Sequence, residues 1–252
     1  MAQLNCQRAI AVLPVAAIEQ HGPHLPLSVD TALADAMVRA SLPHIPSDLP
    51  ALFLPTQAIG YSPEHTAFPG TLTLRASTVI QLWTDIAESV YASGVRKLVI
   101  FNTHGGNVGL LDVVARDLRA RLGMLVYTTS WFNLPLGDAA AAFNDHEHRF
   151  GIHAGAIETS LMLAIAPERV RMQAASNFAS TSEQRARQHA IIGNGKSAKL
   201  AWQMQDYNPA GAVGNAAAAQ AEHGHALLAA TGRALAALLQ EIDTLPAHTL
   251  QP

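Results

Sequence analysis

The chain has 252 residues, of which 49% are hydrophobic and 14% charged, enough to bury one large α/β core or two small ones. Sixteen basic and nineteen acidic side chains give a net charge of −3 without a basic cluster, which argues against nucleic acid as a partner. No apolar run approaches the roughly 18 residues of a membrane span, no signal-peptide pattern is present, and the lone Cys6 indicates a reducing compartment, so we expect a soluble, cytoplasmic protein without a membrane partner.

Apolar runs alternate with segments of helical periodicity along the first part of the chain. Residues 9–18 (AIAVLPVAAI) predict a strand buried on both faces, and residues 31–42 predict a helix with Asp30 or Thr31 as its cap. Residues 52–58 predict a second strand and residues 71–74 (TLTL) a short one. A helix is expected over residues 77–93, where Gly94 would stop it.

The clearest strand signal, KLVIF at residues 97–101, runs directly into the polar sequence NTHGGN. Further along the chain, the pattern predicts a helix, a strand and two more helices, at residues 108–122, 124–128, 155–165 and 216–242. The more polar residues 174–200 predict a helical excursion with loops. This alternation predicts a mostly parallel sheet that is covered by helices on both faces.

Three polar clusters that interrupt apolar segments contain side chains of the types that bind metals. They are EQHGPH at residues 19–24 with Asp30 after it, NTHGGN at residues 102–107, and HAGAIETS at residues 153–160. The first two clusters follow predicted strands, at the edge where open α/β sheets bind ligands. Glycines after His104 let the backbone approach a ligand closely.

The first cluster has the composition of a paired-metal site. Glu19 and His21 are two residues apart, so in an extended segment their side chains leave from one face, and the turn after them allows Asp30 to return close to both. Two carboxylates, one of which could bridge, together with an imidazole suit two cations. Each cluster alone also fits a solvated turn, a helix cap or, for Glu158, an exposed helix position, but three on one chain favour a metal site.

Four sequences, EQHGPHLPLSVD, GYSPEHTAFPGTLTL, NTHGGN and HAGAIETS, resemble in this order the signatures of the creatininase (creatinine amidohydrolase) family. The resemblance implies a single domain over residues 1–252, built as a three-layer α/β/α sandwich with a mostly parallel central sheet. It also implies two divalent metal ions per subunit (Zn, Mn or Fe), a small-molecule substrate and a homo-oligomer, possibly a hexamer.

Carried over by position, the resemblance makes five side chains metal ligands: Glu19, His21, Asp30, His104 and Glu158. Asp30 would bridge the two ions, with Glu19 and His104 completing one site and His21 and Glu158 the other. His153 would be the catalytic acid/base or substrate-orienting residue. The candidate substrate contacts are Ser62, His65, Gly105, Gly106 and Arg149.

This sequence departs from creatininases proper in two places. Their metal-binding His is followed by Tyr and Glu, where this chain has Gly105 and Gly106, and their Trp–Asp substrate-recognition pair corresponds to Arg149 and Phe150. We therefore expect a pocket of different shape and charge and a substrate other than creatinine. Relatives with the glycine version of the motif include deformylases of formamidopyrimidine intermediates and a peptide-trimming enzyme.

We predict a metal-dependent hydrolase that cleaves the C–N bond of an amide, cyclic amide or formamide with an activated water, while His153 manages the protons. A lactone or peptide hydrolase with the same metal site, and a degenerate member without turnover, are the alternatives. His24 is expected to pack behind the ligands, and His146 and His148 to lie in a solvated segment near the pocket mouth.

Overall fold

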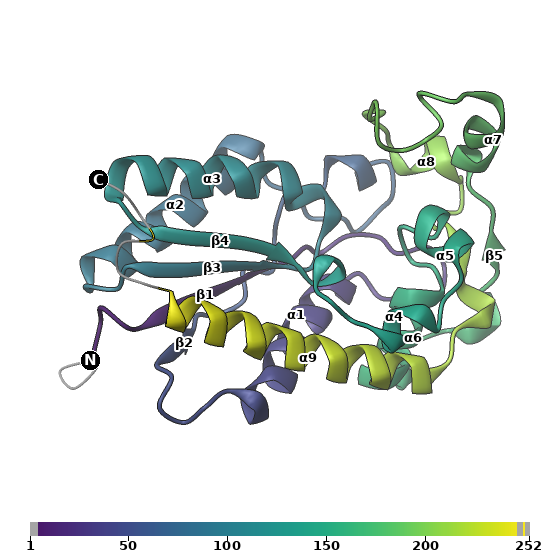
Figure 1. Cartoon of the computed structure of the whole chain (residues 1–252). Coiled ribbons are helices and arrows are strands. Elements are labelled where there is room, and N and C mark those ends of the chain that lie inside the picture. The colour runs from purple at the N-terminus through teal and green to yellow at the C-terminus, as the bar shows by residue number, and fades with distance from the viewer. Residues whose placement is uncertain (1–4, 246–248, 250–252) are drawn as a thin grey trace.

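Within the part of the chain that the computed structural model describes, residues 5–245 and 249, a four-stranded sheet lies at the centre. Its strands are β1 (Ile10–Val15), β2 (Ala51–Phe53), β3 (Lys97–Asn102) and β4 (Leu125–Ser130), in the spatial order β2-β1-β3-β4. All neighbouring strands pair in parallel. The carboxyl ends of the strands therefore lie at one edge of the sheet (Figure 1).

Alternate residues of the strands enter two separate hydrophobic cores, one on each face of the sheet. Ile10 and Val12 of β1 contribute to one core, and Ala11 and Leu13 contribute to the other. All four side chains are at most 1% exposed. This burial on both faces explains why the strands read as continuous apolar runs rather than as an alternating pattern.

Helices cover both faces of this sheet. The helices are α1 (Val29–Ser41), α2 (Ala76–Ala92), α3 (Val108–Leu122), α4 (Asp138–Ala141), α5 (Asp145–Phe150), α6 (Ala156–Ile165), α7 (Thr181–Gln188), α8 (Met204–Tyr207) and α9 (Ala221–Thr244). In Figure 1, α2 and α3 lie on one side of the sheet, and α1 and α9 lie on the other. The predicted fold class, a three-layer α/β/α sandwich with a mostly parallel sheet, is confirmed.

Spacing of apolar side chains explains how the helices dock. Val79, Trp83 and Ala87 of α2 are four residues apart, so they share the face of the helix that packs on the sheet. Helix α3 ends at Gly123, whose φ of 66° is the left-handed conformation that commonly terminates a helix. None of the described helices combines the length and hydropathy needed to cross a membrane.

Three predicted elements differ from the structure. Strand β2 ends at Phe53 rather than at residue 58, because the ladder is interrupted there: Leu54 N–H still donates to the Val12 carbonyl oxygen, but the next bond to β1 comes from Gln57, three residues on instead of two. The TLTL segment forms a single bridge, Leu72 with Ile18, since its neighbours are loops rather than a strand. Helix α9 begins at Ala221 instead of residue 216, after a short 3₁₀ turn and the antiparallel pair β5 (Asn177–Phe178) and β6 (Gly214–Asn215).

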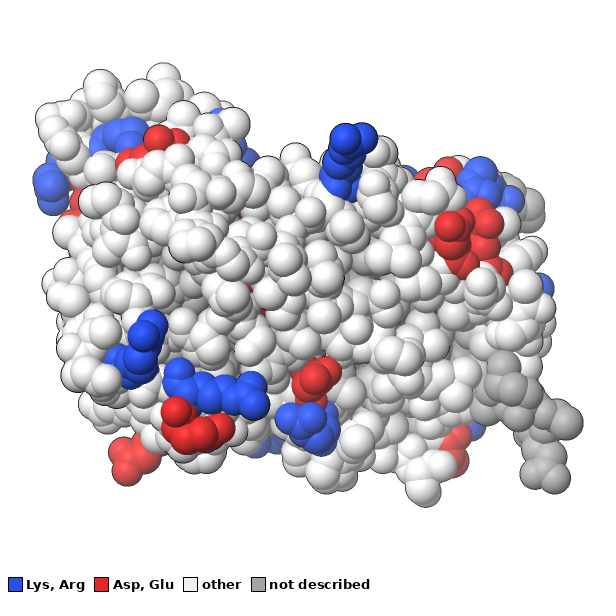
Figure 2. Space-filling model, turned by 180° about the vertical axis from the view of Figure 1, so that it is seen from behind, with Lys and Arg blue, Asp and Glu red and all other residues white. Residues whose placement is uncertain are grey.

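Charged side chains are sparse on the face opposite to that of Figure 1. Lys and Arg lie there singly or beside Asp and Glu, with wide uncharged areas between them (Figure 2). Opposite charges also pair elsewhere on the surface, as between Arg121 and both Glu88 and Asp117. Whether the chain is a single domain stays a prediction.

Candidate metal centre

Five side chains predicted to bind metal come together at the carboxyl edge of the sheet: Glu19, His21, Asp30, His104 and Glu158. Glu19 and His21 follow β1, and His104 follows β3. Asp30 lies in the first turn of α1 and Glu158 in the first turn of α6. The first four are at most 3% exposed, so their polar atoms depend on partners other than bulk water.

His104 directs its Nδ1 at two carboxylates. Its Nε2 lies 3.0 Å from the carbonyl oxygen of Tyr61, which can only accept, so Nε2 carries the proton. Its Nδ1 lies 3.3 Å from Glu19 Oε2 and 3.3 Å from Asp30 Oδ2. Neither oxygen has a hydrogen-bond partner among the described residues. A bare Nδ1 would meet two carboxylate oxygens here, so a positive charge is required between them, either a proton on the ring or a bound cation.

His21 makes a second group of the same kind. Its Nδ1 donates to the carbonyl oxygen of Glu19 at 3.0 Å, so Nε2, which has no hydrogen-bond partner in the described chain, is the nitrogen that faces the carboxylates. Nε2 lies 3.6 Å from Asp30 Oδ1 and 3.9 Å from Glu158 Oε2. Asp30 therefore directs one carboxylate oxygen to each of the two groups.

These separations fit divalent cations. Two ligand atoms that are each about 2.1 Å from a shared ion lie roughly 3 to 3.5 Å apart in a tetrahedral arrangement, close to the 3.3 and 3.6 Å observed. Nitrogen and carboxylate oxygen are also the donors that zinc and manganese accept. The residues present therefore fit two metal ions, with Asp30 between them.

The charges of the centre show what such a cation would replace. Burial disfavours charge on His21, but the carboxylates of Asp30, Glu158 and Glu19 outweigh it and raise its pKa to about 9. Against the same burial, Glu19 and Asp30 raise the pKa of His104 well above its usual value. Protons on these imidazoles balance the carboxylates without a metal, so cation binding is expected to release protons.

A third cluster, Glu19 with His65 and His153, also has the composition of a metal site, but its hydrogen bonds argue otherwise. The amide of Gln20 is oriented by the N–H of Gly22, which donates to Oε1 at 3.0 Å. Its Nε2 therefore donates to His65 Nδ1 at 2.7 Å. Burial lowers the pKa of His65 to about 4, so the neutral ring carries its proton on Nε2, 3.3 Å from Glu19 Oε1. His65 thus places an N–H, not a free ligand nitrogen, beside Glu19.

His153 brings an unprotonated nitrogen into the centre. Its Nε2 donates to the carbonyl oxygen of Gln20 at 2.8 Å, so Nδ1 is bare and lies 3.6 Å from Glu19 Oε1. Burial lowers the pKa of His153 well below its usual value. The ring also lies within ligand distance of His21 and Glu158. It is therefore a neutral imidazole that can accept a proton next to the metal ligands.

A cavity of about 800 Å³ opens above this centre. Its floor includes Glu19, Asp30, His104, His153 and Glu158. Its lining also includes the large apolar side chains Trp131, Phe132, Ile152, Ile157, Leu200 and Trp202, together with polar ones such as Tyr61, Glu64, His148 and Gln203. A polar, titratable floor with large apolar side chains around it is the usual composition of a small-molecule site.

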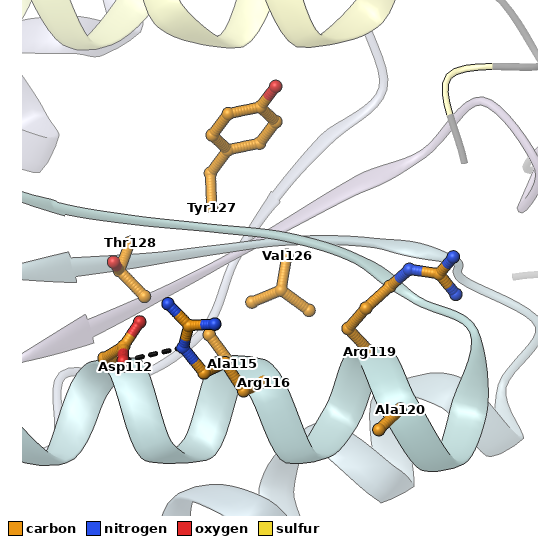
Figure 3. Close-up of a pocket in the computed structure, with 8 residues that line it drawn as sticks. All are labelled: Asp112, Ala115, Arg116, Arg119, Ala120, Val126, Tyr127 and Thr128. Atoms are coloured by element: carbon orange, nitrogen blue, oxygen red, sulfur yellow. Dashed lines mark hydrogen bonds and ion pairs between the residues drawn. The ribbon is translucent and has the colours of Figure 1, made fainter. Parts of the chain in front are cut away.

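A second hollow lies between α3 and β4 and differs in chemistry (Figure 3). Asp112 and Arg116, one turn apart on α3, form an ion pair across its floor at 2.8 Å, and Tyr127 of β4 points away from that pair. The two paired side chains are 66% and 79% exposed, so water screens their charges. The cavity above the metal ligands is therefore the candidate site.

Comparison with known proteins places the chain in a family. A family model described as "Creatininase: Creatinine amidohydrolase" matches residues 1–239. The chain belongs to the creatininase family. It is 35% identical over 179 residues to a mycofactocin precursor peptide peptidase of Mycobacterium tuberculosis, a match that covers 68% of this chain and 64% of the peptidase. The chain thus aligns with less than two thirds of the length of that relative.

Solved structures share the fold. A protein from Bacteroides fragilis is 24% identical, with a TM-score of 0.77 over 98% of this chain and 94% of its own. A creatininase crystal structure is 25% identical, with a TM-score of 0.73 over 95% of this chain and 92% of that one. The similarity therefore extends well beyond the segments that carry the metal ligands.

Only some of the candidate substrate contacts of this creatininase-family chain line the cavity. His65, Gly105 and Gly106 line the cavity. Ser62 is fully buried and does not line the cavity, and its Oγ lies 3.1 Å from Nε2 of His104, a candidate ligand. Arg149 donates to the carbonyl oxygen of Gly193 and packs over the Phe150 ring. Arg149 is not among the residues that line the cavity, and its contact with substrate stays a prediction.

The remaining histidines of the motifs lie around the centre. His24 is buried behind it, where Nε2 lies 2.9 Å from Thr159 Oγ1 and the ring stacks on Phe178. His146 pairs with Glu183 on the surface. His148 lines the cavity, as expected for a segment near its mouth, but it belongs to helix α5 rather than to a loop.

Sequence reasoning missed several side chains that line the cavity, and two of them, Glu64 and Trp202, contact histidines of the centre. Glu64 directs Oε1 to within 3.6 Å of His104 Nε2, and a Cβ at Gly106 would collide with it. Its position beside His65 in SPEHTAFPG was an available signal. Trp202 packs edge-on against His65 from the loop before α8, and no sequence pattern marks it.

Proposed function

We propose that this chain is a hydrolase that holds two divalent cations and cleaves the carbon–nitrogen bond of an amide. The observation that carries the proposal is the geometry of Asp30, which directs Oδ2 to one group of buried ligand atoms and Oδ1 to another. A side chain in this position couples two cations. Solved creatininases described as Mn and Zn-Zn forms support the same chemistry.

Each ion would have its own set of ligands. Glu19, Asp30 and His104 would hold one, and His21, Asp30 and Glu158 the other. Bound there, the cations would polarise the substrate carbonyl and make water nucleophilic at neutral pH. Removing either set should therefore remove turnover.

His153 is the group placed to move protons. Its bare Nδ1 faces the centre, and its Nε2–H is held by the Gln20 carbonyl oxygen. In this tautomer Nδ1 accepts the proton of the attacking water and returns it to the nitrogen that leaves. The burial that lowers its pKa keeps the ring ready to accept.

The cavity favours a substrate larger than one small ring. Its volume of about 800 Å³ falls in the range of sites for drug-sized ligands, and its walls carry Trp131, Phe132 and Trp202. A peptide or a substituted amide fits these dimensions, and the similarity to a peptide peptidase points the same way. The homo-oligomeric state and the cytoplasmic location stay predictions.

Asp30→Asn tests the proposal. The variant is isosteric but has one oxygen instead of two, so it cannot serve both cations, and we expect loss of both metals and of turnover. Zinc and manganese content is measured after purification and reconstitution, and rates are measured on a panel of peptides, amides, formamides and lactones. Asp35→Asn on the same helix, where the carboxylate binds Thr56, is the control.

Two results would contradict the proposal. One is an Asp30→Asn protein that retains both metals at full occupancy. The other is a metal-loaded wild-type protein that hydrolyses lactones but no peptide or amide on the panel.

A further inference from the structure

A buried carboxylate outside the metal centre is unused by the proposed mechanism. Glu147 lies on α5 and is 4% exposed. Its Oε1 accepts a hydrogen bond from the N–H of Ala156 at 2.6 Å, and its Oε2 accepts from the N–H of Asn215 at 2.9 Å. One side chain thus ties together three separate elements: α5, the first turn of α6, and β6.

Glycines shape the space around this carboxylate. A Cβ at Gly151 or Gly155 would collide with Oε1, and one at Gly214 would lie 2.6 Å from it. Two of these glycines bound the segment that joins α5 to α6. The backbone of this segment therefore wraps around the Glu147 carboxylate, and its path depends on that side chain.

The wrapped segment carries two groups of the metal centre. It contains His153 and leads directly into the first turn of α6, which bears Glu158. Between them, Ala154 has a φ of 54°, the left-handed conformation that a residue other than glycine adopts only where its surroundings impose it. That conformation aims the N–H of Ala154 at Glu158 Oε2, 2.6 Å away.

We infer that Glu147 is a positioning residue for the cation site formed by His21 and Glu158. By fixing the N–H of Ala156 and the path of residues 151–155, it imposes the turn at Ala154 and so the direction of Glu158 Oε2. The site of Glu19, Asp30 and His104 has no ligand on this segment, and only His153 touches it from there, so it should depend on Glu147 less than the other site does. The inference rests on the proposed function, since it assumes two cations.

Glu147→Gln separates the two sites. The substituted amide has the same shape, but its nitrogen cannot accept, so either the Ala156 or the Asn215 N–H loses its partner. Metal-free wild-type and variant proteins are titrated with Zn²⁺ by calorimetry, and bound zinc is counted after gel filtration. We expect one equivalent at the wild-type affinity and a second weakened about 10-fold or more, as for other residues that orient metal ligands.

A control and a rescue distinguish positioning from general destabilisation. Glu183→Gln also removes a carboxylate that accepts a backbone N–H at a helix start, from Ser180, and should bind both ions normally. Ala154→Gly removes the penalty of the left-handed turn. In the double variant with Glu147→Gln, it should restore part of the lost affinity for the second ion.

Three outcomes would overturn the inference. A Glu147→Gln protein that binds both ions as the wild type does would show that Glu147 positions nothing. Equal weakening of both sites, together with a lower Tm and no rescue by Ala154→Gly, would show a merely structural role. A wild-type protein that binds fewer than two equivalents would remove the proposed function as well, whereas the first two outcomes leave it standing.

Discussion

Gln20 lies between two proposed metal ligands in the sequence, and its side chain affects one of them through hydrogen bonds. It accepts from Gly22 and donates to His65, whose other nitrogen faces Glu19 Oε1. Glu19 Oε2, the other oxygen, has no hydrogen-bond partner among the described residues and lies 3.3 Å from His104 Nδ1. The amide thus fixes which nitrogen of His65 carries the proton, and through it the orientation of a proposed ligand.

Gln20→Met should weaken the centre without touching a ligand. Without the amide donor, His65 can place its proton on Nδ1, and its bare Nε2 then repels Glu19 Oε1. We expect a 10- to 100-fold loss of metal affinity or activity, the usual effect of removing a partner that orients a ligand. Zinc titration measures it, with Gln57→Met, an amide on an exposed loop, as the control. Unchanged zinc affinity in Gln20→Met would show that Gln20 does not orient Glu19 through His65.

Some residues of the candidate site could be predicted from local sequence motifs, and others could not because their partners are distant in the sequence. Glu19, His21 and His104 stand in short polar motifs directly after apolar strands, so their clustering was predictable. Glu147 looked like one charge in a polar segment, since its role depends on backbone N–H groups up to 68 residues away. The hydrogen bond of Arg149 to the Gly193 carbonyl oxygen was unpredictable for the same reason, because the two residues are far apart in the sequence.

Helix α9 packs closely against α6 and α1 because it has glycines where it crosses them. A Cβ at Gly224 would collide with the backbone carbonyl of Ser160 in α6, and one at Gly232 would lie 2.5 Å from the carbonyl oxygen of Ala40 in α1. The sequence marked these glycines only as interruptions of a long helix. Their function becomes visible once the neighbouring backbone is known.

Gly224→Ala and Gly109→Ala should therefore shift stability in opposite directions. At Gly224 the added methyl group forces α6 and α9 apart and should destabilise the protein by about 1–3 kcal/mol. At Gly109, in the exposed first turn of α3, a Cβ meets nothing within 4 Å, so alanine should stabilise by about 0.4–1 kcal/mol. Urea unfolding of both variants checks this, and a neutral Gly224→Ala would refute the close crossing.

The hydrophobic pattern predicted that the central strands exist but not where every strand ends. KLVIF was predictable because burial on both faces makes β3 apolar throughout. The end of β2 and the fate of TLTL depended on which backbone lay alongside, and hydropathy does not encode that. The start of α9 was set too early because the alanines at 216–218 suit a helix, yet a 3₁₀ turn follows the pairing of Asn215 with β5.

One arginine joins the beginning of the described chain to the end of its last long helix. Arg8, just before β1, binds Asp243 at the end of α9 through Nε and Nη2, at 2.9 and 2.7 Å, and also reaches Asp48 in the loop before β2. Lys97, at the start of β3, donates to the carbonyl oxygen of Ile242. The final helix is therefore anchored at the edge of the sheet opposite to the metal centre.

Arg8→Met should lower the stability of the whole fold in a pH-dependent way. The hydrogen bonds from Arg8 lower the pKa of Asp243, so the folded protein keeps this carboxylate charged at a pH where the unfolded chain takes up a proton. The stabilisation is complete above the unfolded pKa of about 4 and is lost as the pH falls through the lower folded value. The difference in unfolding free energy between wild type and variant should thus be constant from pH 8 to about 5 and shrink below about 4.

Arg116→Met, which removes a pair on the exposed surface of α3, should show no such difference. A difference that grows as the solution is acidified would contradict the assignment of this ion pair, because a depressed carboxylate pKa can only lose its contribution at low pH.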